Sequence, residues 1–154
     1  MIRVAILANL VAYSIVASQP LAYIVFLGKA QRALSAPAYV ELRQRINPVM
    51  SRRLPAIYLV TLLTTAFSIV LGLQAGNSSV LVAGAIALVC LVVDVFLMLR
   101  ASVPVNEVMD RWSTTDHPGD WEEHRANWFR IFGYRQVVLL VGFFGLLVGA
   151  VFQS

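Results

Sequence analysis

Five residues that could bind or activate a small molecule recur at helical spacing in the last third of the chain. Trp121, Arg125, Trp128, Phe132 and Arg135 follow one another at intervals of four, three, four and three. These intervals place all five on one face of a helix. Their rings could stack on a flat molecule, and their guanidinium groups could bind an oxyanion. The same residue types also anchor ordinary membrane helices in the headgroup layer, and the spacing leaves both interpretations open.

Asp94 is a second candidate, because it is the one acidic residue inside a long apolar segment. An acid at the centre of a membrane helix costs roughly 2.5 to 3.5 kcal/mol to insert, and it normally has a partner. We expect Arg135 to be that partner, since it enters its own apolar segment at a similar level. The pair predicts either a general base in a cavity or a structural ion pair between two helices.

Asn47, Asn106 and Trp112 lie in the polar connections between apolar segments. An asparagine amide can bind a phenol or a carbonyl oxygen, so Asn47 and Asn106 are candidate substrate-binding residues. An asparagine is also a common helix cap, and Asn47 precedes Pro48, so the Asn47–Pro48 pair predicts an interrupted helix capped by Asn47. Trp112 is a further candidate substrate-binding residue, and it ends an apolar stripe that predicts an interfacial amphipathic helix after Pro104.

Metal, nucleotide and nucleic-acid chemistry are not indicated by the sequence. His117, Asp120 and His124 form a weak H-x-x-D-x-x-x-H pattern that is more typical of a solvated loop. The chain has no P-loop and no GxGxxG motif. Its net charge of +4 is not gathered into a basic patch on a soluble fold. An enzyme built on this sequence is therefore expected to work without a cofactor, and no nucleic-acid partner is expected.

The elements that must position these residues are membrane helices. Of the 154 residues, 59% are hydrophobic and 13% are charged, a balance typical of a membrane protein rather than a soluble domain. About 20 helical residues cross a bilayer core. The sequence predicts a single all-α domain, residues 1–154, folded as an integral membrane four-helix bundle with amphipathic helical connections. The predicted spans are 4–27, 54–73, 80–99 and 135–152.

The orientation of the bundle follows from its basic residues. All of the 12 Lys and Arg residues except Arg3 lie in the two long connections, 28–53 and 100–136. The positive-inside rule predicts that both connections are cytoplasmic and that both termini lie outside. The first span is longer than the apolar core of a signal peptide, so we expect it to be retained as a helix.

Local signals predict how the helices begin and pack. Asp120 and Glu123 match an aspartate version of the capping box, which predicts a helix from Trp121 to Phe152. Asn9 and Tyr13 share one face of the first span and predict hydrogen bonds between helices. Small residues in the last span predict close helix packing; they are Gly142, Gly145 and Gly149.

Two runs, VPVNEVMDRW and HPGDWEEHRANWFRIFGYR, resemble the small four-helix membrane family typified by anthrone oxygenases. The matching residues are Val103, Pro104, Val105, Asn106, Trp112, Pro118, Asp120, Trp121, Arg125, Trp128 and Arg135. The run RQRINP resembles the Q-x-I-N element of the family through Gln44, Ile46 and Asn47. Where the family has a His or Asn before its last Arg, this chain has Phe132.

The resemblance implies an activity. Anthrone oxygenases convert a polyketide anthrone into an anthraquinone with molecular oxygen. A base removes a proton from the anthrone methylene, and the resulting carbanion reduces oxygen without a cofactor. By resemblance, Arg125 or Arg135 stabilises the anthrolate oxygen while Trp121 and Trp128 hold the rings. The partner expected on this hypothesis is a hydrophobic small molecule or a lipid.

The competing hypothesis is a non-enzymatic membrane scaffold, either a homo-oligomer or a subunit of a larger complex. Its glycine positions in the last span would serve as packing points. A transporter is disfavoured, because the sequence has no pair of broken helices in repeated halves.

Overall fold

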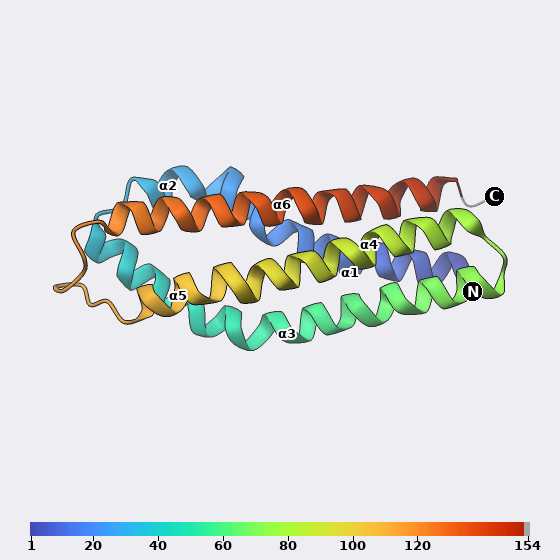
Figure 1. Ribbon diagram of the computed structural model, residues 1–154, viewed down its shortest axis with the longest axis horizontal. Helices are drawn as coiled ribbons and strands as arrows, with labels where there is room; N and C mark the ends of the chain where they lie inside the picture. Colours follow the sequence, from blue (N-terminus) through green and yellow to red (C-terminus); the bar gives the residue numbers. More distant parts are fainter. Residues whose placement is uncertain (153–154) are drawn as a thin grey trace.

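The computed structural model describes residues 1–152, in which four long helical units lie side by side in an elongated bundle (Figure 1). The first unit is α1 (Ile2–Ala22), the π-helical turn η1 (Tyr23–Leu27) and α2 (Gly28–Arg32). The second is α3 (Ala36–Gln74). The third is α4 (Ser78–Leu97), the π-helical turn η2 (Met98–Ser102) and α5 (Val103–Asp110). The fourth is α6 (Trp121–Val151).

Each unit is long and apolar enough to cross a membrane. Large apolar side chains cover the outside of the bundle; they include Leu63, Phe67, Val89 and Phe96. Such a surface needs lipid as its solvent, and the all-α fold of an integral membrane four-helix bundle is therefore confirmed. The first residues of α1 and the last residues of α6 lie beside the short α3–α4 turn, whereas the two long connections lie at the opposite end (Figure 1).

The predicted interruption at Asn47–Pro48 is wrong. Helix α3 runs unbroken from Ala36 to Gln74, with Pro48 and Pro55 inside it. A proline removes one backbone hydrogen bond and bends a helix, but tertiary packing can outweigh that cost. Here the first part of α3 buries Tyr39 and Val40 in the core. Asn47 therefore lies within a helix and is not a cap.

The predicted capping box at the start of α6 is also wrong, although α6 begins at Trp121 as expected. The Asp120 side chain makes no capping hydrogen bond, because its φ of −93° and ψ of 19° lie outside the extended region that a cap requires. Its backbone carbonyl accepts from the Glu123 N–H at 2.9 Å, and its carboxylate lies 3.8 Å from the His124 ring.

The predicted contacts between spans are confirmed. The Tyr13 hydroxyl donates to the Ala87 carbonyl at 3.1 Å, and the Thr65 hydroxyl donates to Asn9 Oδ1 at 2.8 Å. Gly142 leaves room for the Tyr13 hydroxyl, and Gly149 leaves room for the Ala83 methyl group. The small residues of α6 thus let α1 and α4 pack closely against α6.

Candidate functional site

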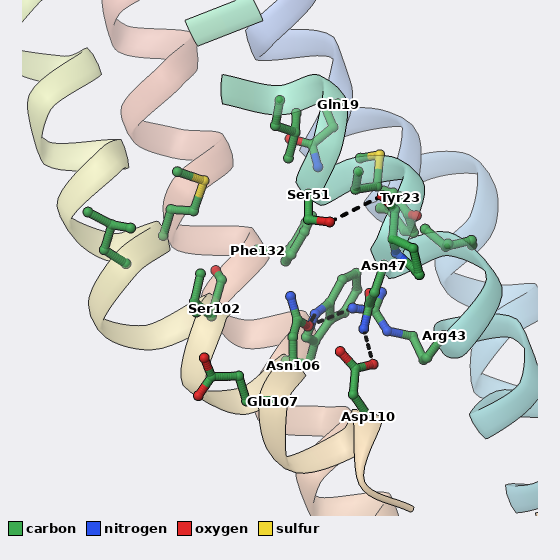
Figure 2. A pocket seen from close by; sticks show the side chains of 18 of the residues that line it. Gln19, Tyr23, Arg43, Asn47, Ser51, Ser102, Asn106, Glu107, Asp110 and Phe132 are labelled. Atoms are coloured by element: carbon green, nitrogen blue, oxygen red, sulfur yellow. Dashed lines mark hydrogen bonds between the residues drawn. The ribbon is translucent and has the colours of Figure 1, made fainter. Parts of the chain in front are cut away.

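A cavity of about 630 Å³ opens between α3 and the η2–α5 segment, at the end of the bundle that holds the long connections (Figure 2). Its volume lies within the range of sites for drug-sized molecules, about 300 to 1,000 Å³. Apolar side chains line it on both sides: Met50, Leu54 and Pro55 from α3, and Met98, Leu99 and Val103 from the third unit. Polar groups gather toward the long connections; they include Arg43, Asn47, Asn106 and Asp110.

Two π-helical turns flank this cavity. Tyr23 of η1 borders it, and so do Met98, Leu99 and Ser102 of η2. A π-helical turn is rare and occurs frequently at functional sites, because it changes the direction of the side chains around it. Its occurrence in two helices beside one cavity supports the cavity as the candidate site.

The aromatic and cationic stripe of α6 lies on one face of the helix, as its spacing predicts, and the structure turns the part from Arg125 to Arg135 toward the bundle interior. The Trp128 indole stacks on the Phe132 ring at 3.9 Å between centroids. The Arg43 guanidinium lies 4.3 Å over Trp128, and the Arg135 guanidinium lies 5.2 Å over Phe132. Because Trp128 is only 1% exposed, it forms part of the packed cavity wall and leaves no ring face free to stack on a ligand.

Asn106 joins three helices at the polar part of the cavity. Its Oδ1 atom accepts from Trp128 Nε1 at 2.9 Å and from Arg43 Nη2 at 2.6 Å. Beside it, the Asn47 amide donates to the Asp110 carboxylate (Figure 2). These two asparagines fix α3 and α5 relative to each other, so the polar side of the cavity is held by hydrogen bonds.

The predicted partnership of Asp94 and Arg135 is confirmed. Arg135 Nε lies 2.8 Å from Asp94 Oδ1, and Arg135 Nη2 donates to the Tyr58 hydroxyl at 2.8 Å. The Tyr58 hydroxyl donates in turn to Asp94 Oδ2. Arg135 Nη1 reaches Ser102 at 3.4 Å. Arg135 borders the cavity, whereas Asp94 is fully buried behind it.

This geometry favours the structural interpretation of Asp94. Both of its carboxylate oxygens accept hydrogen bonds from buried groups, and its exposed fraction is 0%. A general base needs hydrogen-bond reach to the proton that it removes. The pair joins α4 to α6 and holds the Arg135 guanidinium at the cavity wall.

The remaining candidates lie away from the cavity. Arg125 Nη1 donates to the backbone carbonyls of Gln31 and Leu34, at 3.2 and 3.1 Å, so it fastens the α2–α3 connection to α6. Trp121 lies under the Arg125 guanidinium at 4.4 Å. Trp112 packs edge-on against the His124 ring at 5.3 Å. These contacts are those of side chains that hold the connections in place.

Two residues of the site, Arg43 and Tyr23, were not predicted from the sequence. Arg43 is 3% exposed and follows Tyr39 by one helical turn. That spacing could have placed it on the buried face of α3. The expected break at Asn47 hid the continuation of this face to Met50 and Leu54. Tyr23 carries no comparable signal, because it lies in a uniformly apolar run.

Five of the nine candidate residues border the cavity: Asn47, Asn106, Trp128, Phe132 and Arg135. They come from three different helices, and Asn106 and Arg135 contact the wall formed by Trp128 and Phe132. No family model, curated protein or solved structure was found to match this chain.

Proposed function

We propose that this membrane protein binds a flat hydrophobic aromatic molecule in the cavity and promotes its cofactor-independent oxidation by molecular oxygen. The observation that carries the proposal is the lining of the cavity, where apolar side chains of α3 and η2 lead to a cluster of arginine and asparagine groups. The resemblance to anthrone oxygenases supports the proposal, because six residues that match the family pattern border this cavity: Ile46, Asn47, Val103, Asn106, Trp128 and Arg135.

The apolar side chains account for the choice of a flat hydrophobic body. Met50 and Leu54 of α3 line the cavity together with Met98 and Leu99 of η2. Methionine side chains adapt to irregular apolar shapes, so a fused ring system can lie between the two helices. The carbonyl or phenol oxygen of such a molecule would then lie among Ser102, Asn106 and Arg135.

In the proposed reaction the substrate itself supplies the electrons that reduce molecular oxygen. A base takes one proton from the anthrone methylene, and the negative charge spreads onto the ring system and its oxygen. Donors at that oxygen stabilise the anion. One oxygen molecule then oxidises the methylene carbon to a carbonyl, and the second oxygen atom leaves as water with the two methylene hydrogens. We place the proton acceptor among the carboxylates that border the cavity, Glu107 and Asp110, rather than at Asp94.

The distribution of charge suggests where the cavity lies in a cell. All of the Lys and Arg residues except Arg3 belong to the end of the bundle that holds the cavity, or to the connections at that end. By the positive-inside rule we place the cavity at the cytoplasmic interface and both termini outside. A hydrophobic substrate would reach it from the bilayer, between α3 and η2.

The scaffold hypothesis loses the feature on which it was based. Gly142, Gly145 and Gly149 lie against Tyr13, Ile86 and Ala83 of the same chain. Their small size is used inside the bundle, so we infer no second function from them.

Oxygen consumption by the purified protein tests the proposal. We expect the protein in lipid nanodiscs to raise the rate of oxygen uptake with 1,8-dihydroxyanthrone above the spontaneous rate in empty nanodiscs. One oxygen molecule should be consumed for each anthraquinone formed. A 10,10-dimethylanthrone control, which has no methylene proton, should consume none. A rate equal to that of empty nanodiscs, with the protein folded, would contradict the oxidation.

A further inference from the structure

Three arginines are buried in the bundle, and Arg43 is the one without a strong acceptor among residues 1–152. Arg135 faces the Asp94 carboxylate, and Arg125 has two backbone carbonyls and the Glu122 carboxylate, 3.5 Å away. Arg43 donates from Nη2 to the neutral Asn106 amide, and its buried Nε atom has no hydrogen-bond partner.

The other neighbours of Arg43 do not replace a counter-ion. The Trp128 ring beneath it is neutral, although its face attracts a cation. The Asp110 carboxylate of α5 acts on Arg43 electrostatically, but it accepts a hydrogen bond from Asn47. Among residues 1–152 Arg43 forms no salt bridge. A buried charge is costly unless it is paired and hydrogen-bonded.

The position of Arg43 suggests what completes the pairing. It borders the cavity and lies at its polar part, beside Asn106 and across from Asp110 (Figure 2). The stack on Trp128 and the bond to Asn106 hold the guanidinium plane in one orientation before any ligand binds. A planar guanidinium held in this way is suited to a carboxylate or a phenolate oxygen.

We propose that Arg43 is the anion-binding residue of the cavity, and that the molecule bound there carries an ionised acidic oxygen on its flat apolar body. This inference rests on the cavity of the proposed function but not on the oxidation. The same chemistry could be supplied by a free aromatic acid or by the phosphate of an anionic lipid.

The test compares two probes of equal shape, anthraquinone-2-carboxylate and the uncharged anthraquinone-2-carboxamide, by equilibrium dialysis against the protein in phosphatidylcholine nanodiscs. The wild-type protein should bind the carboxylate about tenfold more tightly than the amide. Arg43→Gln should remove that preference, because glutamine carries no charge to pair with the carboxylate. Arg45→Gln is the matched control, because Arg45 is exposed and pairs with Glu41 on the same helix.

Two outcomes would overturn the inference. One is a wild-type protein that binds the amide as tightly as the carboxylate, a result that does not depend on any variant folding. The other is a folded Arg43→Gln variant that keeps the preference for the carboxylate. If Arg43→Gln proves unfolded, Arg43→Lys is measured in its place. It should retain part of the preference for the carboxylate, because lysine keeps the positive charge but lacks the planar pair of guanidinium donors.

Nanodiscs that contain phosphatidylglycerol separate the two sources of the anion. Competition that weakens carboxylate binding in the wild-type protein, and that is lost in Arg43→Gln, supports Arg43 as the anion site with a lipid phosphate as its partner. Carboxylate binding that phosphatidylglycerol leaves unchanged supports Arg43 as the anion site with a free aromatic acid as its partner. Arg43-dependent binding without oxygen uptake would contradict the oxidation alone, whereas oxygen uptake without a charge preference would contradict this inference alone.

Discussion

Replacing Asp94 by asparagine is expected to destabilise the folded bundle by about 3 to 5 kcal/mol, because breaking a buried ion pair leaves an uncompensated charge. The Arg135 guanidinium is 1% exposed and has Asp94 as its one carboxylate partner within residues 1–152. Asparagine keeps the shape of the side chain and removes the negative charge. The free energy of unfolding, measured by titration with a denaturing detergent and followed by circular dichroism, reports the loss.

Two controls isolate the charge effect. Asp116→Asn removes a carboxylate from an exposed loop position and should change the free energy of unfolding by less than about 0.5 kcal/mol. The double variant Asp94→Leu with Arg135→Leu removes both charges, and it should be more stable than Asp94→Asn alone. A change below about 1 kcal/mol for Asp94→Asn would show that the pair is not buried as described.

Replacing Ser51 by phenylalanine is expected to weaken the binding of a flat aromatic probe by about 100-fold, or about 2.8 kcal/mol. Ser51 borders the cavity from α3, and its hydroxyl donates to the Pro48 carbonyl of its own helix at 3.1 Å. Its hydroxyl hydrogen-bonds within its own helix, and the residue is exposed. A phenyl ring at this position fills space that the ligand needs, and the packed core stays unchanged.

Equilibrium dialysis with anthraquinone measures this effect. Ser51→Ala keeps the cavity open and should bind within about twofold of the wild-type protein. The free energy of unfolding of Ser51→Phe should stay within about 0.5 kcal/mol of the wild-type value, as for most surface substitutions. Wild-type affinity in a folded Ser51→Phe variant would mean that the ligand binds elsewhere.

The sequence predicted the features that depend on local pattern. The spacing of Trp128, Phe132 and Arg135 correctly indicated one shared helix face, since helical periodicity needs no tertiary information, whereas the inward direction of that face came from the fold. The pairing of Asp94 with Arg135 also followed, because a charge inside a membrane requires a partner at the same depth. The four spans followed from their apolar length, although the helices extend beyond those spans at the end with the long connections.

The features that depend on tertiary packing were not predictable. Pro48 and Asn47 suggest a broken helix locally, but the contacts of Tyr39 and Arg43 with α6 keep α3 continuous. A binding role for the stripe required open ring faces, whereas Arg43 from another helix covers the Trp128 indole. Trp112, Trp121 and Arg125 have residue types suited to a site, and only the fold reveals that their partners are backbone carbonyls and neighbouring rings.

Photolabelling with 2-azidoanthraquinone tests most directly whether the cavity between α3 and η2–α5 is the binding site. The protein in nanodiscs is irradiated with the probe, digested and sequenced by mass spectrometry. We predict labels within residues 46–55 of α3 and 98–107 of η2 and α5, and their loss on addition of excess anthraquinone. Labels concentrated in the apolar groove between Val82 and Phe144, at the other end of the bundle, would contradict the assignment. So would labels spread along the lipid-facing surface that excess anthraquinone does not displace.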